Sequence, residues 1–264
     1  MEKEKRAAII GVLAVTLLLV LVFSLKGGGE ITSADDVFVQ YSTYISSLKN
    51  IETLIEAEHG ELYRKGLVEA PNYSCKFKYV SGGESGKQML YLIESEEPGV
   101  SPLFSAYYNN SMFFMDRAGR KTRASLIEGE SLLTKFEPPY LGFSLDQVES
   151  GELEKRGGNY YASFKLLPNR FNSFYKNNIL KPGEGVGISY MNISDVLLEI
   201  ELDKKLKPVY SKITAFKSSK DAETGEDIQV PIKTTTYTFV AENDAVEITP
   251  PEDLDLYRLV SKLF

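Results

Sequence analysis

The residue types that most often perform catalysis are sparse in this sequence. It contains one histidine, His59, and one cysteine, Cys75, in 264 residues. No G-x-S-x-G nucleophile motif occurs. His59 is expected at the end of a helix, near the last carbonyls, and Cys75 on the apolar side of a strand as a buried thiol. The chain is therefore predicted not to be an enzyme and to need no cofactor, with a hydrolase built on two distant carboxylates as a less favoured alternative.

The polar loops also contain few candidates for a functional site. The acidic stretch Asp221–Asp227 gathers oxygen ligands but lacks the spacing of a calcium-binding loop, so we expect a solvated turn and no metal site. Three Asn-x-Ser sequons occur at predicted strand edges or turns, where a glycan could be carried. They begin at Asn72, Asn109 and Asn192.

Apolar and aromatic side chains at regular spacing are the stronger candidates for binding. Tyr41, Tyr44 and Leu48 fall on one stripe of a predicted helix. Predicted strands add alternating large side chains. An ordinary core is the plain interpretation of all of them, whereas a curved sheet too open to fill itself would leave a cleft for an apolar ligand. The strand candidates are Phe77, Tyr79, Tyr91, Ile93, Phe113 and Met115.

The stretch 7–25 (AAIIGVLAVTLLLVLVFSL) is free of formal charge and long enough, as a helix, to cross a bilayer. We expect a retained anchor, with a cleaved signal peptide as the alternative. Basic residues precede the stretch, which predicts a cytoplasmic N-terminus and a single-pass cell-membrane protein. The expected organisation is a cytoplasmic tail (1–6), a transmembrane anchor (7–25), a linker (26–32) and an extracytoplasmic domain (33–264).

The composition of the chain restricts the classes of partner and the cell compartment that we expect. The net charge of −7 argues against a nucleic-acid partner, because phosphate binding needs a basic surface. A single cysteine allows no intramolecular disulfide, which is easiest to reconcile with a prokaryotic cell-envelope protein. The expected partners are the membrane, a lipid or apolar small molecule, and as an alternative a protein of a membrane complex.

The elements that must position these residues are mostly strands. Apolar positions from Val37 to Ile55 recur at intervals of three and four residues and predict one helix that ends near His59 and Gly60. From Tyr73 onward the period becomes two, with short turns between segments. The predicted fold is α+β: a strongly curved antiparallel half-barrel of about ten strands with an amphipathic helix on its concave side, plus the transmembrane helix. A strand at 245–249 and a short helix at 254–263 are expected to close the chain.

Three stretches of the sequence carry a resemblance to a known group of proteins. The hairpin Tyr107–Asp116, the strand–turn–strand Leu198–Val209 and the ending Tyr237–Pro251 resemble the LolA/LppX-like lipoprotein and lipid carriers. The likeness covers most of 33–251, but no lipobox cysteine is present. It implies a half-barrel with a helical lid that holds a lipid or acyl chain in its concave face. The alternative function is a non-enzymatic scaffold or interaction module of a cell-envelope membrane complex.

Overall fold

One antiparallel sheet forms the body of the protein. The computed structural model describes residues 30–60, 72–81, 87–94, 104–109, 112–125, 144–170 and 193–260. A single α-helix is present in this part of the chain, α2 (Ala34–Ser47). The strands are β1 (Asn50–His59), β2 (Tyr73–Val80), β3 (Gln88–Glu94), β4 (Phe104–Tyr108), β5 (Met112–Arg117), β6 (Arg120–Ser125), β7 (Val148–Arg156), β8 (Asn159–Leu166), β9 (Asp195–Leu202), β10 (Pro208–Lys220), β11 (Asp227–Glu242) and β12 (Arg258–Leu259).

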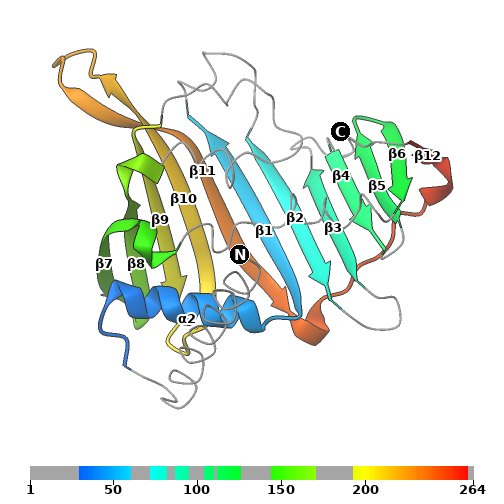
Figure 1. Cartoon of the computed structure of the whole chain (residues 1–264), viewed down its shortest axis with the longest axis horizontal. Helices are drawn as coiled ribbons and strands as arrows, with labels where there is room; N and C mark the ends of the chain where they lie inside the picture. The colour runs from blue at the N-terminus through cyan, green and yellow to red at the C-terminus, as the bar shows by residue number, and fades with distance from the viewer. Residues whose placement is uncertain are drawn as a thin grey trace, which may run out of the picture.

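The sheet consists of two meanders joined in its middle. Its strand order is β12-β6-β5-β4-β3-β2-β1-β11-β10-β9-β8-β7, so β1–β6 form one half and β7–β11 the other. The halves meet where β1 pairs antiparallel with β11, from Ile51 opposite Glu242 to His59 opposite Lys233. Among the described strands, β12 is the one that pairs in parallel, with β6. Figure 1 shows the resulting broad, twisted sheet with α2 across one side of it.

Helix α2 begins with a complete capping box. The Ser33 hydroxyl accepts a hydrogen bond from the Asp36 N–H, and the Asp36 carboxylate accepts one from the Ser33 N–H. These bonds satisfy donors that a helix start leaves unpaired. The Asp36 carboxylate also accepts a hydrogen bond from the Thr32 N–H at 3.0 Å, which makes the largest contribution to lowering the pKa of Asp36. Gly151 lets the helix approach β7 closely, since a Cβ there would lie 3.0 Å from the Ala34 Cβ.

The helix is shorter than its apolar spacing predicted. It ends at Ser47, and the expected continuation to His59 is instead β1. Ile51 and Ile55 are four residues apart, a spacing that fits both a helix face and one side of a strand. The β-branched residues between and around them, with glutamates at alternate positions, favour the strand. His59 therefore ends a strand, and its predicted place at a helix end is wrong.

The predicted fold class also needs correction. Within the described residues the sheet is open and has twelve strands, not about ten. In the part of the chain that the structure describes, no helix is long and apolar enough to cross a membrane, and 7–25 lies outside that part. The transmembrane helix is thus not supported. The expected strand at 245–249 is absent, and 254–263 gives a 3-10 turn and β12 up to Val260, where the described part ends.

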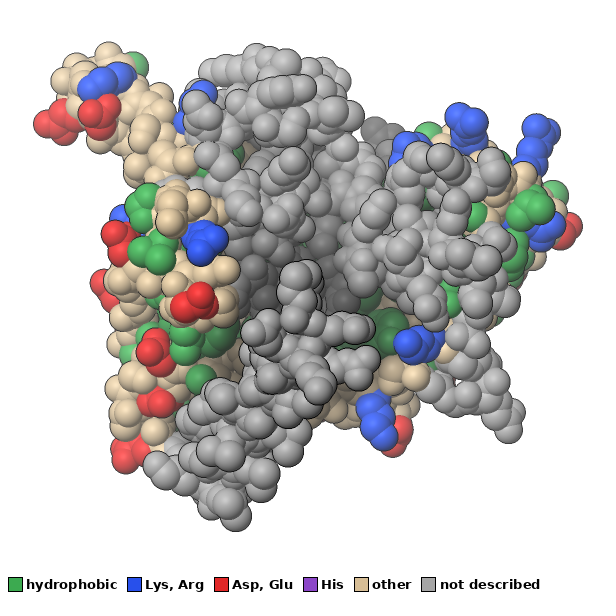
Figure 2. Space-filling model, in the orientation of Figure 1, with side chains coloured by type: hydrophobic (Ala, Val, Ile, Leu, Met, Phe, Trp, Pro, Cys, Tyr) green, Lys and Arg blue, Asp and Glu red, His purple; other side chains and the backbone are tan. Residues whose placement is uncertain are grey.

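The two faces of the sheet differ in size and composition. Side chains from β1–β5 and β8–β11 that point to the same side as α2 form one large buried cluster, which we call the apolar face. On the opposite side, Tyr107, Phe114 and Tyr257 form a small cluster beneath the C-terminal segment. In the view of Figure 2, acidic side chains gather on the side of the molecule that carries β7, β8 and α2.

A glycine is required at position 60, where the chain leaves the pair formed by β1 and β11. A Cβ added there would lie 2.0 Å from the Pro231 carbonyl oxygen, a backbone atom that cannot rotate away. The Gly60 N–H donates to the Ile232 carbonyl at 3.0 Å, which keeps the two segments close.

We therefore expect Gly60→Ala to destabilise the protein by about 1–3 kcal/mol through overpacking, and to lower the melting temperature by several degrees. The opposite exchange, Ala118→Gly, is the control, because Ala118 has φ of 50° in a tight turn and glycine relieves that conformation. Thermal unfolding followed by circular dichroism would measure both. Equal melting temperatures for Gly60→Ala and the wild type would contradict the close approach.

Candidate functional site

The apolar face brings nearly all the predicted binding residues into one cluster. Six of them are buried in it, and Leu48 and Tyr79 pack against it as partly buried side chains. Only Tyr44 lies apart, at the end of α2 beside the sheet. The grouping agrees both with a ligand site and with a core, so the ligand role of these residues stays a prediction. The six are Tyr41, Phe77, Tyr91, Ile93, Phe113 and Met115.

Helix α2 is fixed to the sheet by aromatic contacts and one buried hydrogen bond. Phe38 packs edge-on against Phe164 with ring centroids 5.7 Å apart, and Tyr41 packs likewise against Phe239 at 6.0 Å. The Tyr41 hydroxyl donates to the Ser211 hydroxyl over 2.9 Å. Burial raises the pKa of Tyr41 well above its usual range, which keeps the phenol protonated as the donor.

The apolar face extends well beyond this helix. The contacts of α2 are mainly with β7, β8 and β9, and Figure 1 shows it on that half of the sheet. On the other half, Tyr91 packs edge-on against Phe104 with centroids 6.0 Å apart. Tyr108 and Phe113 follow across the next strand pair at 6.4 Å. Within the described residues, no second helix lies over this aromatic half.

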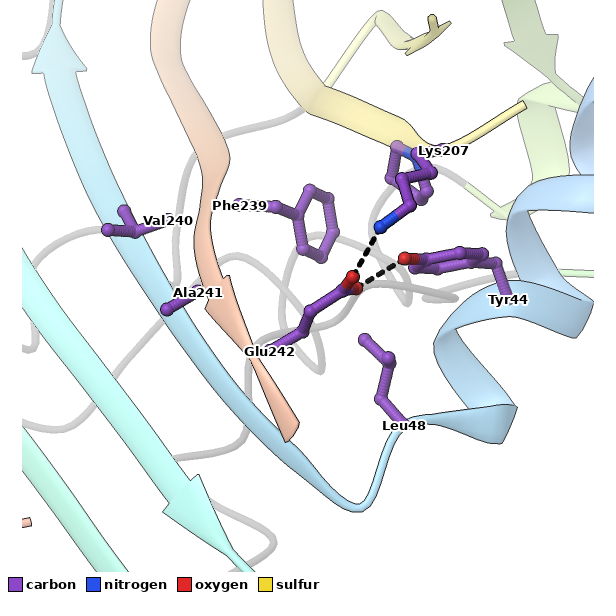
Figure 3. Close-up of a pocket in the computed structure, with 8 residues that line it drawn as sticks. Tyr44, Leu48, Lys207, Phe239, Val240, Ala241 and Glu242 are labelled. Carbon is purple, nitrogen blue, oxygen red and sulfur yellow. Dashed lines mark hydrogen bonds and ion pairs between the residues drawn. The ribbon is translucent and has the colours of Figure 1, made fainter. Parts of the chain in front are cut away.

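A half-open pocket of about 190 Å³ lies where α2 ends beside β10 and β11 (Figure 3). Its apolar wall includes Leu48 and Phe239, and three polar groups meet at its mouth. The Lys207 ammonium donates to one oxygen of Glu242 at 2.6 Å, and the Tyr44 hydroxyl donates to the other. We call this group the rim triad.

The rim triad is tied together by charge. The Lys207 ammonium, followed by the Tyr44 hydroxyl, holds the pKa of Glu242 below its usual value. The same carboxylate raises the pKa of Lys207. Burial and then the bond to Glu242 raise the pKa of Tyr44. All three groups are thus in their ordinary charge states near neutral pH, and the triad ties the end of α2 to Lys207 and to the end of β11.

Lys233 and Thr235 are among the buried polar residues of the apolar face that were not foreseen from the sequence. Lys233 and Thr235 on β11 are 1% and 3% exposed, and they share a side with Tyr237 and Phe239. The signal was present, because counting back in twos from the aromatic residues places both on the inner face. The run Lys233–Thr236 is polar throughout, however, and gives no sign of burial by composition.

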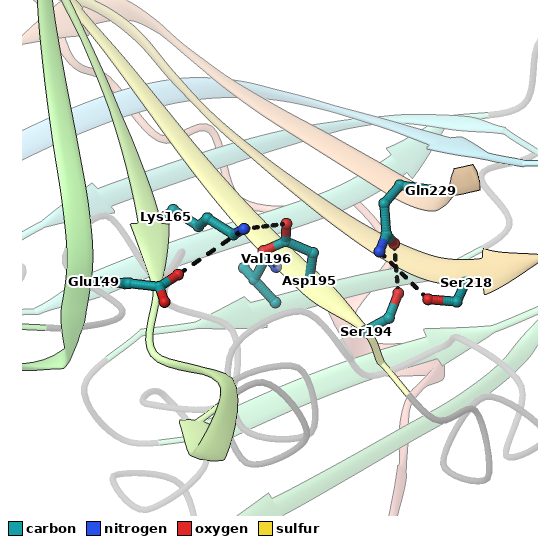
Figure 4. Close-up of polar contacts among 7 residues, drawn as sticks. All are labelled: Glu149, Lys165, Ser194, Asp195, Val196, Ser218 and Gln229. Atoms are coloured by element: carbon teal, nitrogen blue, oxygen red, sulfur yellow. Dashed lines mark hydrogen bonds and ion pairs between the residues drawn. The ribbon is translucent and has the colours of Figure 1, made fainter. Parts of the chain in front are cut away.

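A second polar cluster lies at the opposite ends of the strands from the rim triad (Figure 4). Lys165 is 3.4 Å from Asp195 and 3.9 Å from Glu149, linking β7, β8 and β9. The Gln229 side chain accepts a bond from Ser194 at 2.6 Å and donates one to Ser218 at 3.3 Å. These contacts connect the ends of neighbouring strands.

The remaining predicted sites stay predictions. Asn72 lies half-buried just before β2, and the Asn109 side chain accepts a hydrogen bond from the Met112 N–H at 3.0 Å to close a hairpin. Asn192 lies outside the described residues. In the Asp221–Asp227 turn, Asp221 accepts bonds from the N–H groups of Glu223 and Thr224. Among the described residues, no three His, Cys, Asp or Glu side chains are placed to hold a metal ion.

The buried bond between Tyr41 and Ser211 gives a double-mutant test of how α2 is attached. We expect Tyr41→Phe to cost about 1–3 kcal/mol, because it leaves the Ser211 hydroxyl buried without its donor. Adding Ser211→Ala to Tyr41→Phe should restore most of that loss. Urea unfolding of the wild type, both single variants and the double variant would measure the coupling. Strict additivity of the two single changes would contradict the contact.

The rim triad predicts a specific acid sensitivity. The folded-state pKa of Glu242 is lowered, so its stabilising contribution is present above the ordinary value of 4.5 and is lost as the pH falls through the folded-state pKa. Glu242→Gln should therefore lower stability near neutral pH and flatten the loss of stability below pH 4.5. Urea midpoints measured from neutral to acidic pH would show this. A variant profile parallel to that of the wild type would argue against the triad.

Comparisons with known proteins found no match to the sequence but did find similar solved structures. No family model matches the sequence, and no curated protein matches it. Among solved structures the chain is similar to Mycobacterium tuberculosis lipoprotein LppX, with a TM-score of 0.47 and 8% identity over 81% of this chain and 97% of LppX. It is also similar to LprF from Mycobacterium bovis, with a TM-score of 0.43 and 12% identity over 83% of this chain and 96% of LprF. The expected resemblance to LppX-like proteins is thereby confirmed.

Proposed function

We propose that the protein binds a lipid or another apolar ligand on the apolar face of its sheet. The observation that supports this most directly is the mismatch between that face and the helix that lies on it. The face runs from β5 across the sheet to β8, whereas α2 lies mainly over β7, β8 and β9. An alkyl chain would add apolar contacts to those that already bury the side chains of this face.

The composition of the aromatic half suits an alkyl chain. It combines flat rings such as Tyr91 and Phe113 with the flexible thioethers of Met89 and Met115. Methionine adapts its shape to irregular neighbours, which favours the binding of chains that differ in length or branching. Cys75 adds a small, buried thiol to the same surface.

A second function is supported by a different feature, the projecting end of the β10–β11 hairpin. Beyond Phe216 and Pro231 these strands pair only with each other in the described part of the chain. Figure 1 shows this arm extending past the sheet. It carries Ile228 with 39% of its surface exposed. Such an arm could contact a protein partner of a membrane complex, which would make the sheet a scaffold and not a carrier.

Native mass spectrometry of the purified protein would test the lipid proposal. We expect a bound apolar molecule close to one per chain, or uptake of one cis-parinaric acid molecule per chain after lipid removal. An unliganded mass together with no uptake of the fatty acid would contradict the proposal and favour the scaffold.

A matched pair of methionines on β5 would place the binding on the correct face. Met115 belongs to the apolar face, and Met112 packs on the opposite side against the small cluster. We expect Met115→Gln to weaken fatty-acid binding about tenfold through lost apolar contact, measured at a temperature at which the variant is folded. Met112→Gln should leave the affinity unchanged. Equal effects of the two changes on affinity would contradict binding of the fatty acid on the apolar face.

A further inference from the structure

We propose that the edge of the sheet formed by β6 and β12 docks on an anionic membrane surface. The docking surface consists of Arg120, Lys121 and Arg258 together with Leu256 and Leu259, and we call it the basic edge. It lies at the end of the sheet opposite β7. The inference concerns contact with the bilayer itself and is independent of the ligand proposed for the apolar face.

Two leucines project from this edge into solvent. Leu256 has 61% of its surface exposed and Leu259 has 66%, more than the exposed apolar side chains Ile228 and Val240 elsewhere in the described chain. Strand β12 is two residues long and is the outermost strand, so both leucines lie at the rim of the sheet. Apolar side chains beside cations bind to the interface of an anionic bilayer, because they leave water while the cations remain near the phosphates.

Cationic side chains line a half-open pocket of about 600 Å³ between β6 and β12. They are Arg120, Lys121 and Arg258. Lys121 pairs with Asp253, whereas neither arginine forms an ion pair with another residue in the described part of the chain. A guanidinium group can donate several hydrogen bonds to one phosphate, so the two arginines are suited to bind lipid phosphates. A pocket of this volume accommodates a phospholipid head group.

The hairpin of β5 and β6 brings two like charges together beside this pocket. Arg117 and Arg120 lie directly opposite each other where the hairpin turns, and both are exposed. Like charges at directly opposite positions of two strands repel each other and lower stability. Lipid phosphates would reduce this repulsion, so the hairpin gains stability at an anionic surface.

The outer strands at the two ends of the sheet carry different charges. Strand β6 (RKTRAS) has three basic residues and no acidic one, whereas β7 (VESGELEKR) at the opposite end contains three glutamates. Figure 2 shows Lys and Arg side chains projecting from the end of the molecule where Figure 1 places β5, β6 and β12. An anionic surface therefore attracts the basic edge and repels the end at β7, which orients the chain despite its net charge of −7.

The basic edge adjoins the outer end of the apolar face. Thr122, which lines the pocket, lies opposite Met115 on β5, and Met115 belongs to the apolar face. A bilayer in contact with the basic edge would therefore lie one strand away from that face.

A single indole at the basic edge would report its contact with a bilayer, since the chain contains no tryptophan. The full chain carrying Leu259→Trp would be reconstituted into vesicles of phosphatidylcholine with brominated acyl chains, with or without phosphatidylglycerol. We expect strong quenching with phosphatidylglycerol, and loss of most of it without this lipid or at high salt, because salt screens the attraction. Val240→Trp is the control, because Val240 is 58% exposed on β11 in the middle of the sheet and should be quenched little in all vesicles.

Charge variants of the Leu259→Trp protein assign the docking to the arginines. Arg120→Gln together with Arg258→Gln should lower the ratio of quenched to unquenched protein about 10- to 30-fold, because each cation near an anionic surface adds to the attraction. Lys204→Gln together with Lys205→Gln is the matched control, since it removes two exposed cations from the turn between β9 and β10. Asp255→Asn removes an exposed carboxylate just before β12 and should raise the ratio. All of these side chains are exposed, so the melting temperatures should stay close to that of the wild type.

The outcomes separate this inference from the proposed function. Absence of quenching in the Leu259→Trp protein, or quenching that depends neither on phosphatidylglycerol nor on the two arginines, would overturn the docking of the basic edge. Phe77→Trp in the same vesicles reports lipid on the apolar face. Quenching of Phe77→Trp without quenching of Leu259→Trp would retain the proposed function and reject this inference, and the reverse result would do the opposite.

Discussion

The antiparallel pairing of β1 with β11 is the interaction on which the rest of the structure depends. It joins the meander β1–β6 to the meander β7–β11. Two halves that are each built from hairpins thereby become a single surface. Each half alone would expose an unpaired central edge, and edge strands of that length favour wrong pairing. The close approach of Gly60 to the Pro231 carbonyl shows how tightly this seam is closed at one end. At the other end Lys207, Glu242 and Tyr44 tie the seam to helix α2.

The joined sheet has a consequence for function. Inward side chains of nine strands, β1–β5 and β8–β11, merge into one apolar face. A sheet this broad buries its apolar side only if something of comparable breadth lies against it. Helix α2 provides part of that cover and is anchored through Tyr41 to Ser211. Lys233 and Thr235 lie within the face on β11 itself, so the seam sets the extent of the apolar surface and also the place of these two buried polar residues.

The sequence predicted some levels of this structure better than others. Alternation from Tyr73 onward located most strands, because a half-buried strand alternates apolar and polar residues along the sequence. The end of α2 was misplaced because Ile51 and Ile55 satisfy the helical and the strand period together. Twelve strands could not be counted because β12 is two residues long and β1 was assigned to the helix. Lys233 and Thr235 escaped notice because the run Lys233–Thr236 is polar throughout, so its composition gives no sign of burial even though its alternation with Tyr237 and Phe239 does.

The central claim is that the ligand lies on the apolar face, and the absence of tryptophan from the chain makes this measurable. Phe77→Trp places a single reporter on the apolar face, and Phe114→Trp places one in the small cluster on the opposite side. Palmitate carrying bromine in its tail quenches indole fluorescence only on contact. The structure predicts strong quenching of Trp fluorescence in the Phe77→Trp protein and little in the Phe114→Trp protein. Equal quenching in both, or quenching in the Phe114→Trp protein alone, would contradict it.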